Sequence, residues 1–342
     1  MKAWRIYAPG DMRKDELPAQ SVGSECVKIK ILKTAVTHSD NYIFEGKKQA
    51  RFPLTLGRHC VAMVTEVGED VKTFTRGNKV VLSPYAVCHD CDECNSGREE
   101  NCERKLEYGV TEEGFFRDFA VVGANDLYGL PERVDDGEAM FLEHIATAVG
   151  IINRLALQKG EHIAIVGATV TGIILAQVAM YYQAVPVLLD LRRDRLDIAA
   201  SLGVYYTVDT TESDAFKKVF SLTGGRMAEA CAFMSPETMP LTRVFDFCRS
   251  KGRIAVGEFG DGGLNVDLAA AMKKQLTVYC TGGMGKNMAS AINMLANKTV
   301  KVAPLISKVI GFDDLPSTLS EMKELPDKYI KVVVDMTGGQ PF

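Results

Sequence analysis

Residues 162–172 read His162-Ile163-Ala164-Ile165-Val166-Gly167-Ala168-Thr169-Val170-Thr171-Gly172. The apolar start predicts a buried strand, the glycine-containing stretch predicts a tight turn, and the apolar residues that follow predict a helix. A turn of this kind directs backbone amides and the N-terminus of a helix toward a pyrophosphate. Its middle position is Thr169 instead of glycine, which is a departure at the place where the backbone approaches the phosphates. We expect Gly167, Thr169, Val170 and Gly172 to contact a dinucleotide.

The next predicted strand, at residues 185–189, is followed by Asp190. This acid comes about 20 residues after the glycine turn, where a carboxylate accepts both ribose hydroxyls of NAD and repels the 2′-phosphate of NADP. We therefore expect NAD as the cofactor. Arg192 and Arg193 come shortly afterwards, and they leave an arrangement that tolerates NADP open.

Strands and helices alternate along the rest of this region. Further strands are predicted at residues 205–208, 230–233, 253–256 and 276–280. Helices are predicted at residues 172–182, 193–202, 214–223 and 240–248. Such alternation is typical of a doubly wound parallel sheet, so we predict an α/β Rossmann domain for dinucleotide binding at residues 146–283.

The first third of the chain has a different pattern, because short strand-like segments are separated by Gly and Pro. These segments lie at residues 26–32, 62–67, 79–82 and 119–122. The pattern predicts a barrel-like β domain. A last strand, at residues 330–334, would complete this domain. We therefore assign residues 1–145 and 284–342 to the catalytic domain, and we treat the Rossmann domain as an insertion.

Length and composition indicate an ordinary globular protein of two domains. The chain has 342 residues, a mean hydropathy near zero and a formal net charge of −4. Because Lys and Arg do not cluster, nucleic acid and anionic membrane are not expected as partners. The apolar run at residues 163–180 is interrupted by glycine and polar residues, so it predicts a strand, a turn and a helix instead of a membrane span. Residues 1–7 alternate like a strand and do not resemble a secretory signal.

Four cysteines, Cys88, Cys91, Cys94 and Cys102, are separated by two, two and seven residues. Four thiolates at this spacing can form a tetrahedral shell around one zinc ion. The segment between them is polar and has no apolar period, so a metal would supply the stability that a core does not. A shell of four thiolates has no open position for a substrate. We therefore predict one structural zinc in a lobe at residues 86–104.

The remaining cysteines of the nine in the chain are scattered among apolar residues and are expected to be reduced. An odd number of cysteines together with a zinc lobe predicts a cytoplasmic protein.

Several further segments carry a resemblance that covers essentially the whole chain. They are Thr37-His38-Ser39-Asp40, Pro53 to His59, Glu143-His144, Asp190 with Arg195, and Gly252 to Gly257. With the four-cysteine lobe and the Rossmann pattern, the chain resembles the medium-chain dehydrogenase/reductase family, the zinc alcohol and polyol dehydrogenases. It looks most like the polyol and threonine dehydrogenase branch. The resemblance implies a GroES-like first domain, NAD-dependent dehydrogenase activity, Arg195 and Gly257 at the cofactor, and a homodimer or homotetramer.

The resemblance also implies a second, catalytic zinc, but two of its three ligand positions are altered in this chain. Thr37 and Arg58 occupy these two positions, and only the third, Glu143, keeps a usable ligand. A neutral threonine hydroxyl is a poor ligand for zinc, and a guanidinium cannot lose a proton to become one. We therefore expect no zinc at this position.

Three interpretations of the altered site stay open. In the first, no second metal binds, and Arg58, paired with Glu143 or Asp40, polarises a substrate carbonyl or holds a carboxylate. In the second, the ligand set has moved by one residue to a group of neighbours: His38, His59, His144 and Cys60. In the third, these histidines only pack or lie on the surface, and the site is inactive.

A path for a proton is expected beside this site. The resemblance implies that the hydroxyl of Ser39 touches the substrate oxygen and starts a relay whose last position is Tyr42 in this chain. Tyr42 would need a neighbouring cation to act as a base near neutral pH. His59 is a second candidate acid or base.

We therefore predict an NAD(H)-dependent oxidoreductase that interconverts a small polar secondary alcohol and its ketone, with Arg58, Ser39 and His59 in place of a catalytic zinc. Two alternatives remain. One is a zinc-independent carbonyl or enone reductase, and the other is a non-catalytic NAD(H)-binding redox sensor.

Overall fold

The computed structural model describes residues 1–212, 214–257, 265–281, 287–326 and 328–338. The chain divides into two compact units: unit 1 comprises Met1–Glu143 and Leu305–Phe342, and unit 2 comprises His144–Pro304.

The two boundaries compare differently with the predicted ones. The first lies close to the predicted break after residue 145. The predicted return at residues 283–284 lies outside the described residues, and the chain returns to unit 1 at Leu305. Helix α9 (Met288–Ala296) therefore belongs to unit 2, whereas the sequence assigned residues 284–342 to the catalytic domain. One reason is local: the side chain of Gln177 exchanges two hydrogen bonds, of 3.0 and 2.9 Å, with the backbone of Lys301.

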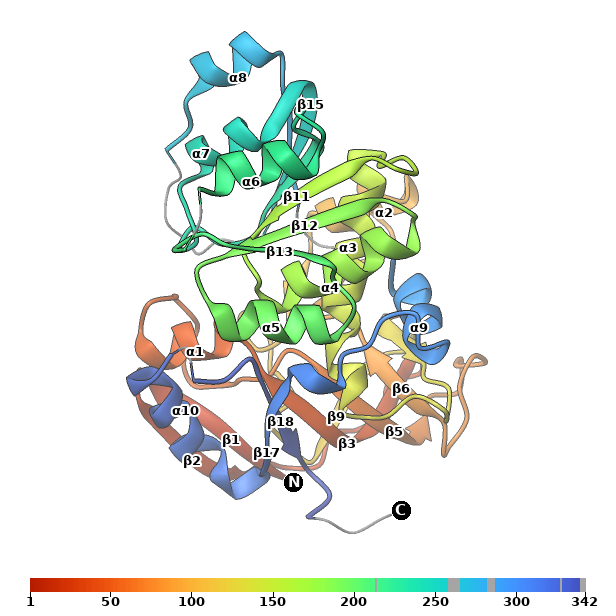
Figure 1. Cartoon of the computed structure of the whole chain (residues 1–342). Helices are drawn as coiled ribbons and strands as arrows, with labels where there is room; N and C mark the ends of the chain where they lie inside the picture. Colours follow the sequence, from red (N-terminus) through yellow and green to blue (C-terminus); the bar gives the residue numbers. More distant parts are fainter. Residues whose placement is uncertain (213, 258–264, 282–286, 327, 339–342) are drawn as a thin grey trace. The chain divides into compact units, whose positions relative to one another are not determined.

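Unit 2 is built around a six-stranded parallel sheet with the order β13-β12-β11-β14-β15-β16 (Figure 1). Its strands are β11 (His162–Val166), β12 (Val185–Asp190), β13 (Tyr206–Asp209), β14 (Ala228–Phe233), β15 (Cys248–Val256) and β16 (Thr277–Cys280). Its other helices are α3 (Leu142–Leu155, which begins at the end of unit 1), α4 (Val170–Tyr181), α5 (Arg193–Ser201), α6 (Ala215–Leu222), α7 (Leu241–Phe247) and α8 (Leu268–Lys274). The predicted doubly wound sheet is confirmed. Because the strand order reverses beside β11, the carboxyl end of β11 is the expected place for a dinucleotide.

Several elements of unit 2 differ from the prediction, and helices α8 and α9 were not predicted. Helix α7 passes directly into β15 at Cys248, whereas the sequence predicted a strand only from residue 253. Within β15, Lys251 has a φ of 60°, and the register against β14 shifts, which hides the start of the strand from an alternating pattern. Helix α3 was not predicted, although its apolar residues recur at helical spacing.

Unit 1 is a β domain with two main sheets. The larger has seven strands in the order β10-β6-β5-β3-β18-β17, with β9 also paired to β3, and the smaller has the order β2-β1-β4. The strands are β1 (Lys2–Ala8), β2 (Asp11–Glu16), β3 (Cys26–Val36), β4 (Leu54–Thr55), β5 (Cys60–Val67), β6 (Lys79–Leu82), β9 (Phe119–Gly123), β10 (Leu127–Gly129), β17 (Ile306–Gly311) and β18 (Lys331–Asp335). Two short strands, β7 (Tyr85–Ala86) and β8 (Leu106–Glu107), pair with each other. The helices are α1 (His38–Glu45), α2 (Asp92–Asn95) and α10 (Leu315–Glu324).

The last strand completes unit 1, as the sequence predicted. Val332 of β18 pairs antiparallel with Val36 of β3, almost three hundred positions earlier in the chain. Alternate residues of β3, among them Val27 and Ile29, are fully buried in the core of this β domain. Within the described ranges, no helix has both the length and the apolar character that crossing a membrane requires.

Candidate active site and zinc lobe

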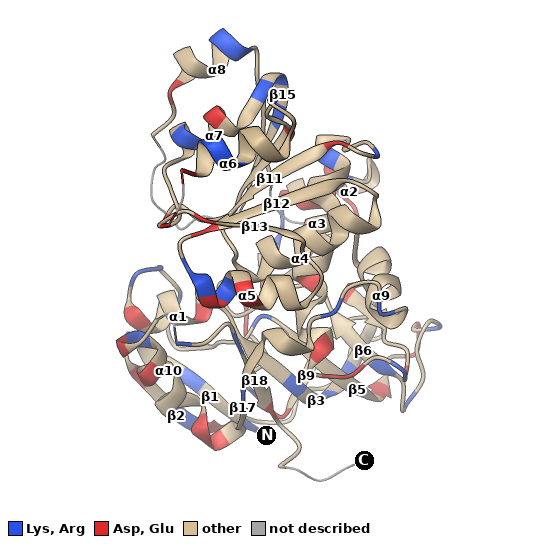
Figure 2. Ribbon diagram, viewed as in Figure 1, with Lys and Arg blue, Asp and Glu red and all other residues tan. Residues whose placement is uncertain are grey.

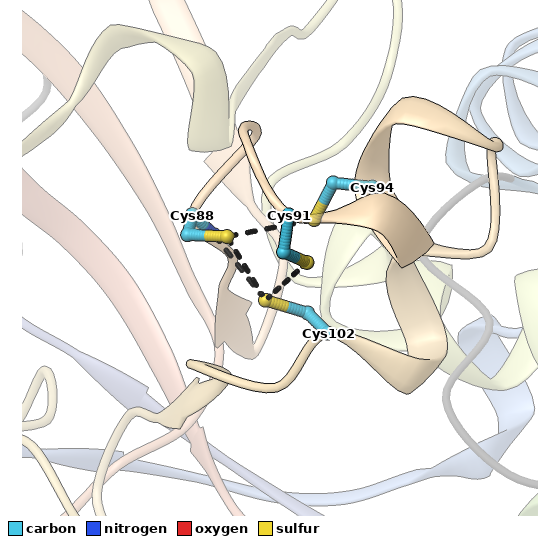
Figure 3. A group of neighbouring side chains, drawn as sticks. All are labelled: Cys88, Cys91, Cys94 and Cys102. Atoms are coloured by element: carbon cyan, nitrogen blue, oxygen red, sulfur yellow. Dashed lines mark hydrogen bonds between the residues drawn. The ribbon is translucent and has the colours of Figure 1, made fainter.

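The four predicted zinc ligands lie together in the loop that connects β7 and β8 (Figure 3). Their sulfur atoms all lie within 4.8 Å of one another, with 3.9 Å between Cys88 and Cys94, 4.0 Å between Cys91 and Cys102, and 3.5 Å between Cys88 and Cys102. A tetrahedral zinc with bonds of about 2.3 Å needs sulfur atoms about 3.8 Å apart. The donor set therefore fits a zinc ion with four thiolate ligands.

The backbone of the lobe favours thiolates at two of these positions. Amide groups of Cys94 and Glu103 lower the pKa of Cys91 to about 6, and the amide of Cys88 lowers the pKa of Cys102 below its ordinary value. Burial raises the pKa of Cys94 to about 12, so a bound metal would be needed to hold all four as thiolates.

Arg58 stands in a turn that other residues of unit 1 fix tightly. Gly57, the residue before it, has a φ of 94°, and a Cβ atom there would lie 2.7 Å from the ring of Phe116. The amide of Gly57 donates to Oδ1 of Asp40 at 2.8 Å. The other carboxylate oxygen of Asp40 accepts from the amide and the hydroxyl of Thr37, at 2.8 and 2.6 Å. This capping box begins α1 and holds the turn that presents Arg58.

The capping box bears on two expectations from the sequence. Thr37, which was expected at a ligand position of the catalytic zinc, is the N-cap of α1, and its hydroxyl is bonded to Asp40. Asp40 is fully buried and bonded to Thr37 and Gly57, so of the two alternative partners predicted for Arg58, Glu143 or Asp40, the pairing with Asp40 is not found.

Arg58 forms its ion pair with Glu107, a residue that the sequence did not indicate. Its Nη1 atom contacts Oε1 of Glu107 and donates to Oγ of Ser39 at 3.2 Å. The guanidinium also lies over the ring of Tyr85, 5.3 Å from the centroid. Lys48 extends the group, because its Nζ lies 3.4 Å from Oγ of Ser39 and 3.7 Å from Glu107.

Arg58 is charged although only 7% of it is exposed. Burial opposes this charge, but the nearby Glu143, Tyr85 and Glu107 raise the pKa of the guanidinium above its ordinary value. For Tyr85, burial raises the pKa of the hydroxyl, while Arg58 acts in the opposite direction. The site therefore holds a permanent, desolvated positive charge beside a serine hydroxyl.

Glu143, at the third of these positions, lies against His59. Nε2 of His59 contacts Oε2 of Glu143, and both residues belong to unit 1. The next residue, His144, makes a different contact: its Nδ1 lies 2.9 Å from the hydroxyl of Thr171 in α4. His38 stacks on Tyr42 within α1, with ring centroids 6.4 Å apart.

The shifted ligand set predicted as one alternative is not assembled in the described part of the chain. The histidines make the separate contacts given above, and Cys60 is buried in the β core of unit 1. Among the described residues, the four lobe cysteines are the one group of three or more His, Cys, Asp or Glu side chains whose ligand atoms come close enough to share a metal.

Tyr42 lies on α1 with 36% of its surface exposed. The Nζ atom of Lys47 stands 5.9 Å from the centre of its ring, so a cation is near it. Its other neighbour is the ring of His38, and its role as the end of a proton relay stays a prediction.

The glycine turn has the predicted form. Gly167 has a φ of 111°, and a Cβ atom on Gly172 would lie 2.0 Å from the carbonyl oxygen of Gly167. Thr169 is the N-cap of α4, and its hydroxyl accepts from the amide of Gly172 at 3.1 Å. Thr169 therefore replaces a glycine with a helix cap, and Val170 begins the helix. The amides at this helix start could hold a pyrophosphate.

Asp190 ends β12 directly beside this turn. It is 6% exposed, and it accepts hydrogen bonds from the amide of Ala168 at 2.6 Å and the amide of Arg192 at 2.8 Å. The hydroxyl of Thr238 donates a third, at 3.1 Å. A carboxylate has about four acceptor sites, so a ribose hydroxyl could still bind it.

Arg195 and Gly257 are the remaining residues predicted at the cofactor. Arg195 lies in the first turn of α5, where its charge acts on Asp194. Gly257 follows β15, and its amide donates to the carbonyl of Phe233 at 2.9 Å. Both belong to unit 2, with the glycine turn and Asp190.

Both halves of the chain match known protein families. Residues 23–132 match the family described as alcohol dehydrogenase GroES-like domain, and residues 170–297 match the family described as zinc-binding dehydrogenase.

Whole proteins are similar as well. The chain is 27% identical over 334 residues to an uncharacterized zinc-type alcohol dehydrogenase-like protein of Haemophilus influenzae, which covers 97% of this chain and 98% of that protein. It is 28% identical over 308 residues to a sorbitol dehydrogenase of Halalkalibacterium halodurans, with 88% and 89% covered. The fold is similar to that of the alcohol dehydrogenase TADH from Thermus sp. ATN1, with a TM-score of 0.89, 21% identity and coverage of 98% and 99%.

Proposed function

Because the chain belongs to the medium-chain dehydrogenase/reductase family, we propose that it is an NAD(H)-dependent oxidoreductase that interconverts a small polar secondary alcohol and its ketone. Arg58 and Ser39 would act where the resemblance places a catalytic zinc. The observation that carries this proposal is the hydrogen bond of 3.2 Å from the buried guanidinium of Arg58 to the hydroxyl of Ser39.

In ketone reduction the hydroxyl of Ser39 would donate its proton to the substrate oxygen as the hydride reaches the carbonyl carbon, and in alcohol oxidation the oxygen of Ser39 would take that proton back. Its oxygen accepts from Arg58 at 3.2 Å and from Lys48 at 3.4 Å, and a hydroxyl oxygen has two lone pairs. Its own hydrogen must then point elsewhere, toward a substrate oxygen in this proposal. Two cations beside the oxygen would stabilise the negative charge that forms as the proton leaves.

Arg58 would support the substrate oxygen directly. Its planar group has five donors, and the described contacts to Glu107 and Ser39 leave others to polarise a carbonyl or hold a carboxylate. NAD, when bound, accepts or supplies the hydride. The zinc in the four-cysteine lobe would be structural, because its four thiolate positions leave no place for a substrate.

The test begins with zinc content and turnover. We expect one zinc per subunit by elemental analysis, and oxidation of a panel of polyols and β-hydroxy acids that includes sorbitol, followed as NADH absorbance. On the best substrate, Arg58→Ala should lower kcat by on the order of a hundredfold, because it removes a preorganised donor. The affinity for NADH, measured by fluorescence, should stay within about twofold of the original value.

The matched control is Arg76→Ala, which removes an exposed arginine from the same unit. Equal turnover of the Arg58 and Arg76 variants would refute the role of Arg58. Two zinc ions per subunit would refute the replacement of the catalytic metal. Tight NADH binding without turnover on any substrate would favour a non-catalytic redox sensor.

A further inference from the structure

We propose that Asp194 determines cofactor specificity: it holds Arg192 in a bidentate ion pair and thereby keeps this guanidinium from the 2′-phosphate of NADP(H). The inference rests on the proposed function, because it requires that the glycine turn of unit 2 binds a dinucleotide.

Arg192 is placed where an NADP-binding arginine would be useful. Its backbone amide donates to Oδ1 of Asp190 at 2.8 Å, so the residue begins directly beside the predicted ribose-binding acid. It is also the N-cap of α5. An arginine near this acid can accommodate a 2′-phosphate, because its fork of donors matches the oxygens of a phosphate.

Asp194 occupies that fork. Nε of Arg192 donates to Oδ1 of Asp194 at 3.1 Å, and Nη2 donates to Oδ2 at 2.7 Å. The bond from Arg192 lowers the pKa of Asp194, so the pair stays charged at neutral pH. Figure 2 shows basic and acidic residues next to each other along α5, where Arg193 pairs with Asp197 as Arg192 pairs with Asp194.

Asp190 alone would discriminate less strongly against NADP(H). Its carboxylate is fixed by three donors, from Ala168, Arg192 and Thr238, and cannot turn away from a bound ribose without losing them. It therefore repels a 2′-phosphate, but a free arginine next to it could compensate for that repulsion. Holding Arg192 in an ion pair removes the compensation.

The chain offers a matched control one position further along. Arg193 pairs with Asp197 through a bond of 2.9 Å on the same helix, and both side chains are exposed. Asp197→Asn removes the same charge from α5 and leaves Arg192 paired.

The experiment measures dissociation constants of NADH and NADPH by nicotinamide fluorescence at constant ionic strength. The full-length protein is compared with Asp194→Asn, Arg192→Ala, the double variant and Asp197→Asn. Asp194→Asn should tighten NADPH binding about fivefold, which is the size of effect expected from breaking one exposed ion pair. The same variant should change NADH binding less than about twofold. The gain should vanish in the double variant, because it depends on the guanidinium of Arg192.

Unchanged NADPH binding in Asp194→Asn would overturn the proposal. So would an equal gain in the double variant or in Asp197→Asn, because loss of a negative charge alone would then explain it. Failure of the original protein to bind either dinucleotide would instead refute the proposed function, and it would be seen before any variant is made.

Discussion

Arg58 organises its surroundings because a buried guanidinium needs partners. Glu107 supplies the opposite charge and Tyr85 supplies an aromatic face, and these two residues stand opposite each other in the short β7–β8 pair. Without them, a charge that is 7% exposed would be costly to bury. Arg58 thus comes with a set of partners that suits a buried arginine.

The turn before Arg58 gives a prediction about stability. Gly57→Ala should lower the free energy of unfolding by about 3 kcal/mol, because the new Cβ would require a left-handed backbone and would lie 2.7 Å from Phe116. Thermal and urea unfolding measure the change.

Gly129→Ala is the control, since a Cβ atom there meets nothing within 4 Å and Gly129 is not among the residues with positive φ. Its effect should stay within about 1 kcal/mol. Equal stability of the Gly57 and Gly129 variants would show that the turn tolerates a side chain and that glycine is not what places Arg58.

At the scale of elements, the zinc lobe closes the hairpin that carries the partners of Arg58. The four cysteines lie between β7 and β8, and Tyr85 of β7 pairs in register with Glu107 of β8. Most other described side-chain contacts of the lobe are exposed, among them the pairs of Arg98 with Glu93 and of Arg104 with Asp90. A metal that only stabilises this loop would therefore also hold Glu107 and Tyr85 against Arg58.

Loss of the zinc should consequently disturb the contact between Arg58 and Glu107 and lower turnover. In Cys91→Ser we expect zinc content to fall from one to near zero per subunit and trypsin to cut at Arg98 and Arg104. Turnover should fall by about tenfold, because a displaced Glu107 no longer holds Arg58. Zinc analysis, limited proteolysis and steady-state rates measure the three effects.

Cys26→Ser changes a half-buried cysteine of unit 1 outside the lobe and should leave all three values unchanged. A Cys91 variant that loses zinc and becomes sensitive to trypsin but keeps full turnover would separate the lobe from the Arg58 site.

The elements and contacts that the sequence predicted are those with local signals. The spacing of the cysteines and the strand, glycine turn and helix at residues 162–182 depend on neighbours in the chain, and both were found as predicted. The partner of Arg58 could not be found in this way, because Glu107 lies 49 residues further along and meets it through tertiary packing. Nothing in the spacing around Glu107 marks it, apart from its place just after the lobe.

At the scale of the whole molecule, the resemblance to the family implies a homodimer or homotetramer, and one sheet edge of unit 2 suits that expectation. β16 ends the parallel sheet, and no described strand pairs with its outer side. An exposed apolar residue lies on this strand: Val278 is 39% exposed. An unpaired edge with apolar side chains favours pairing with a second copy of the chain.

The unpaired edge of β16 leads to a prediction about the oligomeric state. The unaltered protein should have at least twice the mass of 37.4 kDa by light scattering, and Val278→Lys should shift it toward the monomer, because a charge on the edge opposes strand pairing. Val309→Lys is the matched control: Val309 is 56% exposed on β17, the edge strand of the larger sheet in unit 1, where Lys308 already provides a charge. If the Val309 variant dissociates and the Val278 variant does not, the interface lies on unit 1. A monomeric unaltered protein would mean that the apolar edge of β16 has another role.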